Sequence, residues 1–248
     1  MEFKPTGSIT FLFTDIEGST KLSQEFPDSL QASLDIHHRI LHEAIESNNG
    51  FVFEIIGDAF CAAFENAGDA VKAAVDAQLY LANEKWFDAV IKARMGIHSG
   101  IAEWNGKRYL GYITLARTAR VMSAAYGEQI IVSNDTFESL FNNCHKDSKT
   151  LIFLDPKTSG LRDFEVEERK EISFRDLGER RLKDVIKPIK LFQVTAPGLR
   201  EDFPPLKTLD ARLNNLPVQL TNFIGRENEL KQIKDSLSNT HLLTITGS

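Results

Sequence analysis

Two aspartates occupy positions from which their carboxylates could do chemistry together. Asp15 follows Ser8–Thr14, an apolar, β-branched run whose length indicates a buried strand. Asp58 lies between two further strand-like runs, 51–56 and 59–64. Strand ends and hairpin turns can meet at one edge of a sheet, where paired carboxylates suit a divalent cation such as Mg²⁺. A helix N-cap at Asp15 and a turn residue at Asp58 explain the pattern equally well, so both interpretations stand at this point.

The rest of the pattern predicts the elements that would position these residues. The expected elements, in chain order, are a helix over 30–45, an Ala-rich helix over 67–82, strands over 90–100 and 101–104, a helix over 115–125, a strand over 129–132, a helix over 136–141, and late strands over 172–177 and 190–195. The segment 142–171, between the expected helix over 136–141 and the expected strand over 172–177, is charged and predicts an irregular excursion. The order favours an α+β fold with helices packed on a mostly antiparallel sheet.

Composition places the chain among ordinary globular proteins. Its 248 residues predict one or two domains, and 42% hydrophobic with 26% charged residues excludes disorder throughout. A net charge of −6 argues against nucleic-acid and anionic-membrane partners. No apolar run reaches the roughly 18 residues of a membrane span, and the N-terminus lacks a signal-peptide pattern. Cys61 and Cys144 have neither disulfide-framework nor zinc-ligand spacing, so we expect a cytoplasmic protein.

Several motifs in the right order resemble the class III nucleotidyl cyclases, the adenylyl and guanylyl cyclase catalytic domain. The stretches that carry the resemblance are Phe13–Thr20 (FTDIEGST), Ile56–Ala59 (IGDA), Arg94–Gly100 (RMGIHSG), Ala119–Met122 (ARVM) and Gly127–Ser133 (GEQIIVS). The resemblance covers Ser8 to about Thr195, and we assign the domain to 1–196. It implies a ferredoxin-like core and a head-to-tail homodimer with active sites at the interface.

The resemblance also implies a metal site. Asp15 and Asp58 would hold two divalent ions, Mg²⁺ or Mn²⁺, with help from the backbone carbonyl of Ile16. One ion would lower the pKa of the ribose 3′-hydroxyl, and the other would hold the triphosphate and the leaving pyrophosphate. The backbone amides that open the next helix would cradle the phosphates: Glu17, Gly18, Ser19 and Thr20.

Two basic residues match positions that bind phosphate in the family. Arg120 matches the transition-state arginine, which comes from the partner protomer and whose forked donors bind charge developing on the α-phosphoryl oxygens. Lys183 matches a triphosphate-binding lysine, although a solvated basic run explains it nearly as well. His98, within the Gly-Ile-His motif, is expected to be a buried, hydrogen-bonded histidine rather than a catalytic base.

The residues that match base-reading positions depart from a clean pattern. Adenylyl cyclases carry a lysine four residues before the second metal aspartate, and guanylyl cyclases carry glutamate. This chain has Glu54, which favours GTP because a carboxylate accepts from the N1–H and N2–H₂ groups of guanine. The family has a second position that contacts the purine. Depending on where a one-residue shift is placed in the match to the family, this position is Arg108 or Tyr109, and neither is the residue type that the family uses for adenine or for guanine.

A third departure affects ribose orientation. The family asparagine four residues before the catalytic arginine is Ala116 here, which should lower the rate by misplacing the 3′-hydroxyl. The hydroxyl of Thr114 or Thr118 is a candidate substitute. Because both metal aspartates and Arg120 are present, we still favour an active enzyme.

The C-terminal part predicts a linker and the start of another domain. Four prolines mark 197–217 as a Pro-rich linker. The segment 218–248 resembles the start of an AAA-like signal-transduction ATPase, in which a strand leads into a P-loop. Gly247-Ser248 stops before the Gly-Lys-Ser/Thr that holds phosphates. We therefore expect an N-terminal fragment of a larger regulator whose tail does not bind ATP.

Two functional hypotheses follow. The first is metal-dependent cyclisation of ATP or GTP to the 3′,5′-cyclic monophosphate and pyrophosphate, for intracellular signalling. The second is a catalytically weak or silent cyclase-like dimerisation module that regulates an attached ATPase. A diguanylate cyclase is disfavoured, since the chain has no Gly-Gly-Asp/Glu-Glu-Phe run.

Overall fold

The computed structural model describes residues 4–141, 150–154, 169–211 and 231–236. The chain divides into two units, Met1–Arg212 and Leu213–Ser248. In the second unit the described residues form a short helix over 231–236, so most of the predicted ATPase fragment lies outside the described residues. Among the described residues, no helix combines the length and apolarity that crossing a membrane requires.

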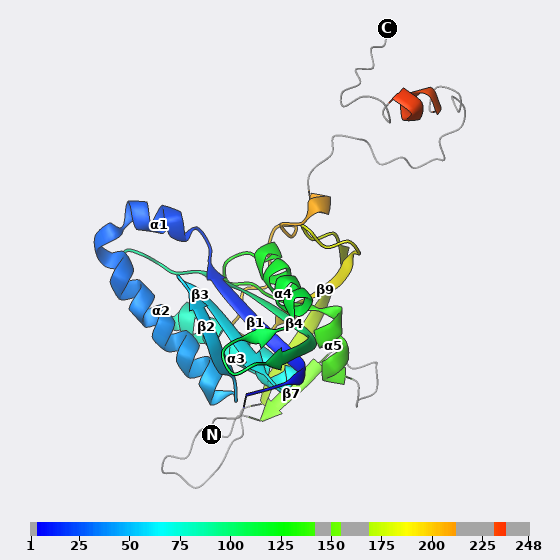
Figure 1. The fold of residues 1–248 in the computed structure, drawn as a ribbon. Helices are drawn as coiled ribbons and strands as arrows, with labels where there is room; N and C mark the ends of the chain where they lie inside the picture. The colour runs from blue at the N-terminus through cyan, green and yellow to red at the C-terminus, as the bar shows by residue number, and fades with distance from the viewer. Residues whose placement is uncertain (1–3, 142–149, 155–168, 212–230, 237–248) are drawn as a thin grey trace. The chain divides into compact units, whose positions relative to one another are not determined.

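The first unit is built on one nine-stranded sheet with helices on both faces (Figure 1). The strands are β1 (Gly7–Ile16), β2 (Phe51–Ile56), β3 (Ala59–Phe64), β4 (Ala93–Trp104), β5 (Tyr109–Leu110), β6 (Ile130–Ser133), β7 (Thr150–Leu154), β8 (Arg169–Arg180) and β9 (Ile189–Thr195). The helices are α1 (Ser19–Glu25), α2 (Pro27–Ser47), α3 (Ala67–Asn83), α4 (Tyr112–Ala124), α5 (Asn134–Phe141) and a 3₁₀ turn, η1 (Leu209–Ala211).

The expected α+β architecture is confirmed. The strands run in the order β2-β3-β1-β4-β6-β9-β8-β7, with β5 paired to β4 off this path. The first four form the antiparallel arrangement of a ferredoxin-like core, with one helical crossover before β2 and another before β4. The pairing of β4 with β6 is parallel, and the other described pairings are antiparallel.

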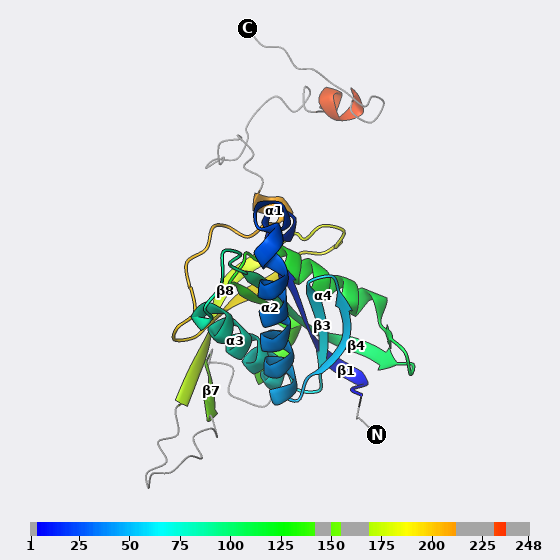
Figure 2. The same cartoon turned by 90° about the vertical axis from the view of Figure 1, so that its left-hand side faces the viewer.

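Alternation along β1 separates two apolar layers. Ile9, Phe11 and Phe13 pack with α4 residues such as Met122 on one face. Leu12 packs with α2 and α3 on the other face. Figure 2 shows α2 and α3 on one side of the sheet and α4 on the other. Asp15 continues the odd-numbered series, so its side chain leaves β1 on the α4 face.

Three sequence expectations need correction. The predicted strands 90–100 and 101–104 are one strand, β4. The predicted irregular excursion contains β7, which pairs with β8, while 142–149 and 155–168 lie outside the described residues. The expected linker does not begin at 197, because the first compact unit extends to Arg212. Backbone hydrogen bonds join this segment to the rest of the unit, from Lys207 to Ala124 and from Leu209 to Arg181.

Candidate active site

The ends of β1 and β3 bring the two aspartates to one edge of the sheet. These strands pair antiparallel, with Phe13 opposite Cys61. The pairing is reinforced one residue further on, where the Phe60 backbone N–H donates to Thr14 Oγ1 at 3.2 Å. Asp58, the turn residue directly before β3, therefore lies at the same end of the sheet as Asp15, the penultimate residue of β1.

Asp58 carries an oxygen that the fold leaves without a partner. Its Oδ2 atom is buried and makes no hydrogen bond within the part of the chain that the structure describes. Because an unpaired buried carboxylate oxygen is costly, this atom is suited to a ligand that the chain itself does not supply. A divalent cation that prefers oxygen ligands fits this donor.

Asp15 is held by a neighbouring cation. Arg94, opposite it on β4, donates through both Nε (2.8 Å) and a terminal guanidinium nitrogen to the same oxygen, Oδ2. Both side chains are about one-fifth exposed, at 22% for Asp15 and 23% for Arg94. Ile16, the predicted carbonyl ligand, is the buried last residue of β1. The arrangement leaves Oδ1 of Asp15 outside the contacts with Arg94.

The protein donors at this edge are few. Among the described residues, no group of three or more His, Cys, Asp or Glu side chains gathers in a metal-binding arrangement. Two carboxylates and a carbonyl fit an ion such as Mg²⁺, which commonly keeps waters and shares substrate phosphates. They do not fit a closed structural zinc site.

The predicted phosphate loop needs one correction. The backbone N–H of Glu17 is already used, since it donates to the Lys92 carbonyl at 2.9 Å. Gly18 adopts the left-handed region, with φ 72°, and α1 begins at Ser19. The amides that stay candidates for phosphate therefore belong to Gly18, Ser19 and Thr20.

The Glu17 side chain has a structural role instead. One oxygen accepts from the Gly127 backbone N–H at 3.0 Å, and the other forms an ion pair with Lys207. Partial burial raises the pKa of Glu17, but the hydrogen bonds from Lys207 and Gly127 and the charges of Lys207 and Arg94 outweigh it. The net result is a lowered pKa, so Glu17 is ionised at neutral pH.

A β-bulge decides where Glu54 points. Val52 pairs with Ala62 but Glu54 pairs with Cys61, so Phe53 is an extra residue in β2. Glu54 therefore shares a face with Cys61, the α4 face. Burial, and next the charge of Glu54, raise the pKa of the Cys61 thiol to about 12.

The same face holds a cavity of about 490 Å³ that brings together the predicted base-reading residues. Glu54, Arg108 and Tyr109 all line it. Tyr109 is 4% exposed, its hydroxyl donates to the Pro5 carbonyl at 3.0 Å, and burial raises its pKa to about 12. Arg108 is exposed. Of the two alternatives, Arg108 has the side chain more available to a ligand.

Arg120 and Lys183 lie on neighbouring elements. Arg120, on α4, donates to Asp184 Oδ2 at 2.5 Å. Lys183 immediately precedes Asp184 in the connection between β8 and β9, and it is exposed. The fold thus presents these two predicted phosphate-binding residues on one surface.

Neither threonine proposed to replace the ribose-orienting asparagine presents its side chain to a ligand, since Thr114 is 8% exposed and Thr118 is fully buried. Thr114 Oγ1 donates to the Ile101 carbonyl at 2.9 Å, and Thr118 Oγ1 donates to the Thr114 carbonyl at 2.9 Å. Ala116 therefore lacks a nearby substitute at these two positions.

His98 is a buried structural histidine, as expected. It is 1% exposed, and its Nδ1 lies 2.8 Å from Ser133 Oγ. Burial lowers its pKa to about 4, partly opposed by Asp135.

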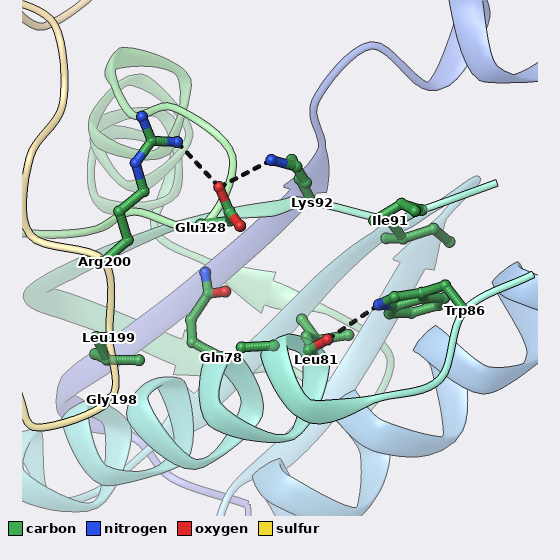
Figure 3. A pocket seen from close by; sticks show the side chains of 11 residues that line it. Gln78, Leu81, Trp86, Ile91, Lys92, Glu128, Gly198, Leu199 and Arg200 are labelled. Carbon is green, nitrogen blue, oxygen red and sulfur yellow. Dashed lines mark hydrogen bonds and ion pairs between the residues drawn. The ribbon is translucent and has the colours of Figure 1, made fainter. Parts of the chain in front are cut away.

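A separate cavity of about 280 Å³, lined by neither aspartate, lies between α3 and residues 198–200 (Figure 3). Its charged groups are paired internally, since Lys92 and Arg200 both contact Glu128 Oε2, at 3.2 and 3.1 Å. Gln78 Nε2 donates to the Ala93 carbonyl at 2.8 Å. The cavity includes none of the predicted site residues.

Sequence reasoning missed three residues that contact the predicted site: Arg94, Asp184 and Lys207. Arg94 and Asp184 lie inside or beside recognised motifs, but nothing in those motifs shows which carboxylate or guanidinium they meet. Lys207 is 190 residues from Glu17 and lies in a segment predicted to be a linker.

Comparison with known proteins identifies the family. Residues 1–183 match the family described as the adenylate and guanylate cyclase catalytic domain. An uncharacterized protein of Mycobacterium bovis is 30% identical over 229 residues, which cover 91% of this chain and 70% of that protein. An alignment of that extent includes 197–210. The adenylate cyclase of Lachancea kluyveri is 30% identical over 217 residues, covering 72% of this chain and 12% of that much longer protein.

Solved structures support the fold. An adenylate cyclase structure from Trypanosoma brucei, in its monomeric state, superimposes with a TM-score of 0.64 at 23% identity, covering 82% of this chain and 94% of that chain. The guanylate cyclase domain of RhGC from Catenaria anguillulae, in complex with GTP, gives 0.59 at 20% identity, covering 78% and 99%. The chain therefore belongs to the adenylate and guanylate cyclase family, and it carries a class III cyclase catalytic domain.

Proposed function

We propose that this protein cyclises a purine nucleoside triphosphate to its 3′,5′-cyclic monophosphate, with release of pyrophosphate. The observation that carries the proposal is the orphaned, buried Oδ2 of Asp58 at the sheet edge that also holds Asp15. An oxygen left unpaired by the fold suits a ligand that arrives with the substrate.

The chemistry assigns separate tasks to the residues of this edge and of the α4 surface. The ribose 3′-oxygen attacks the α-phosphorus while the bond from that phosphorus to the bridging oxygen of pyrophosphate breaks. Asp15, Asp58 and the Ile16 carbonyl would hold two divalent ions, which supply a lowered 3′-hydroxyl pKa and charge neutralisation. Arg120 would bind the α-phosphoryl oxygens through its forked donors, and Lys183 the β- and γ-phosphates.

Base preference leans towards guanine. Glu54 offers a carboxylate to a cavity that Arg108 also lines. That carboxylate would accept from guanine N1–H and N2–H₂, whereas adenine N1 is an acceptor and would be repelled. ATP use is the alternative outcome of the substrate test below.

A head-to-tail homodimer would complete each site. Large apolar side chains are exposed around the start of α4, with Ile101 at 69%, Tyr112 at 86% and Ile113 at 67%. A contiguous exposed apolar patch is typical of a protein–protein interface. Pairing through this face would bring Arg120 of one protomer to Asp15 and Asp58 of the other.

One observation favours the second candidate, a silent dimerisation module. Thr114 and Thr118 are buried and their hydroxyl protons are already donated to backbone carbonyls, so neither is placed to orient the ribose instead of the missing asparagine. If ribose orientation limits the reaction, Ala116→Asn should raise kcat about tenfold. A silent module would gain no activity from that change.

The experiment that tests the proposal is incubation of the 248-residue chain with each of ATP, GTP, CTP and UTP, with Mg²⁺ or Mn²⁺, followed by identification of the product. We expect a cyclic purine nucleotide and stoichiometric pyrophosphate, both lost in Asp58→Asn. Absence of any cyclic product from a folded dimer would retire the enzyme in favour of the silent module.

A further inference from the structure

The segment 205–210, here called the C-terminal strap, is bound to the cyclase unit at its first end. Leu206 is 6% exposed and packs in the apolar cluster that contains Ala124 of α4. The Lys207 backbone N–H donates to the Ala124 carbonyl at 3.1 Å. The Tyr126 hydroxyl donates to the Pro205 carbonyl at 2.9 Å. These contacts hold the strap against the end of α4, where the helix leaves carbonyls unsatisfied.

The other end of the strap is clasped by a reciprocal pair of hydrogen bonds. The Leu209 backbone N–H donates to the Arg181 carbonyl at 3.0 Å. The Arg181 backbone N–H donates to Asp210 Oδ2 at 2.6 Å. Lys207 lies between these two anchors, so its backbone position is fixed and its ammonium group has a limited reach.

That ammonium group reaches the loop that follows the metal-binding strand end. Lys207 Nζ forms an ion pair with Glu17 Oε1 and lies 4.2 Å from the centre of the Tyr126 ring. The second Glu17 oxygen accepts from the Gly127 backbone N–H. Residue 127 must be glycine for this approach, since a Cβ there would lie 2.9 Å from Glu17 Oε2 and 2.7 Å from Lys92 Cβ.

The charge of Glu17 makes this contact relevant to a triphosphate. Glu17 directly follows Ile16 and directly precedes Gly18–Thr20, so it belongs to the same loop as the positions proposed to meet phosphate. A carboxylate there repels a polyanion unless a cation neutralises and orients it. Lys207 supplies that cation and draws the carboxylate towards Tyr126 and Gly127.

We propose that Lys207 is a positioning residue for the cyclase reaction, acting through Glu17 to keep the loop Glu17–Thr20 ready for the substrate triphosphate. This proposal rests on the proposed function for the identity of the substrate. Lys207 itself does not touch the reacting atoms. The strap that carries it is therefore part of the functional domain rather than a spacer.

The kinetic test compares variants of the full 248-residue chain. Lys207→Ala should raise KM for the metal–triphosphate about three- to tenfold, with kcat changed less than KM, because ground-state binding of the polyanion is what suffers. Lys207→Arg should stay near wild type. Arg39→Ala removes another basic residue, on α2, whose ion pairs with Glu43 at 3.5 Å and Glu84 at 3.3 Å lie outside the contacts of Glu17, and it should also stay near wild type.

A double-mutant cycle tests the route through Glu17. In Glu17→Gln the charge that Lys207 neutralises is gone, so adding Lys207→Ala should then change KM by less than about twofold. A full additional loss in the double variant would mean that Lys207 acts by another route, and it would overturn the proposal.

A second readout separates this proposal from the proposed function. Amide hydrogen exchange of peptides spanning 16–25 needs no turnover, and it should rise in Lys207→Ala but not in Lys207→Arg or Arg39→Ala. If wild type makes no cyclic nucleotide, the proposed function fails and the exchange comparison still decides the positioning role. Exchange that is equal in Lys207→Ala and Arg39→Ala would overturn the role of Lys207.

Discussion

At the scale of single residues, Glu54 depends on one extra residue in its strand. Regular alternation would set Glu54 on the same face as Val52, towards α2. The bulge at Phe53 instead pairs Glu54 with Cys61 and turns its carboxylate to the α4 face, where the 490 Å³ cavity lies. A role in base recognition therefore rests on local backbone geometry as well as on residue type.

The role of Glu54 can be tested by reversing its charge. In Glu54→Lys we expect the ratio of GTP to ATP use, measured as kcat/KM, to fall by roughly tenfold, since an ammonium donor cannot accept from guanine N1–H. Glu65→Lys makes the same charge change at an exposed residue outside this cavity and serves as the control. An unchanged ratio in Glu54→Lys would refute base reading by this residue.

The sequence singled out the two aspartates as candidates but did not show their surroundings. Residue type and strand position were enough to single out Asp15 and Asp58. The partner of Asp15, Arg94, depends on the antiparallel register of β1 and β4, which residue periodicity does not encode. For the same reason the contacts of Thr114 and Thr118, which remove them as substitutes for the missing asparagine, came only from the folded chain.

At the scale of elements, short regular runs were predicted well and long-range pairing was not. The predicted strands 51–56 and 59–64 match β2 and β3. Residues 90–104 were divided into two strands, whereas β4 pairs with β1 from Ala102 back to Ala93 without a break. Gly100 marks a close approach to α4, because a Cβ there would lie 2.7 Å from Thr114 Oγ1. Sequence alone cannot distinguish such a glycine from one in a turn.

The packing of α2 on the sheet predicts a pH-dependent stability. His37, on α2, is fully buried, and its ring nitrogens have no hydrogen-bond partner within the described part of the chain. Burial, and next the nearby His38, lower the pKa of His37 to about 3 from its ordinary 6.5. Between pH 3 and pH 6.5 the unfolded chain binds the His37 proton more tightly than the folded chain does. The free energy of unfolding is therefore at its full value above pH 6.5 and falls as the pH is lowered towards 3.

Urea unfolding at pH 7.5 and pH 5 measures this effect. Going from the higher to the lower pH, wild type should lose about 2 kcal/mol more of its free energy of unfolding than His37→Leu, which has no imidazole to protonate. His42→Leu, at a half-exposed position on the same helix, should keep the wild-type pH dependence. Equal losses in wild type and His37→Leu would contradict the burial of a neutral His37.

At the scale of the whole molecule, the misassigned linker has a simple physical cause. Proline density is typical of extended segments, and it indicates neither free movement nor packing. Here Pro205 and Leu206 extend the chain across the end of α4, where their carbonyl and side chain find partners. Proline density agrees with the absence of a helix or strand between 197 and 207, but composition could not show the surface that this segment meets.

Shared active sites in a homodimer predict complementation between two inactive variants. Asp58→Asn removes a proposed metal ligand and Arg120→Ala removes the proposed phosphoryl-binding group, so a mixed dimer would contain one site with neither defect. Mixing the two proteins should restore cyclase activity that each lacks alone. Mixing Asp15→Asn with Asp58→Asn should restore none, because both defects fall on the metal side and every site carries one. No recovery in the first mixture would argue against shared sites.

The most direct test of the central claim is the binding of Mn²⁺ to wild type and to Asp58→Asn. Electron paramagnetic resonance counts free Mn²⁺ in the presence of a triphosphate analogue that cannot cyclise. Because Asp58 Oδ2 is an unpaired buried donor at the same end of the sheet as Asp15, we predict that wild type with the analogue depletes the free Mn²⁺ signal, towards about two ions per protomer. We predict that Asp58→Asn loses most of this binding while staying folded, and equal depletion by the two proteins would contradict the account.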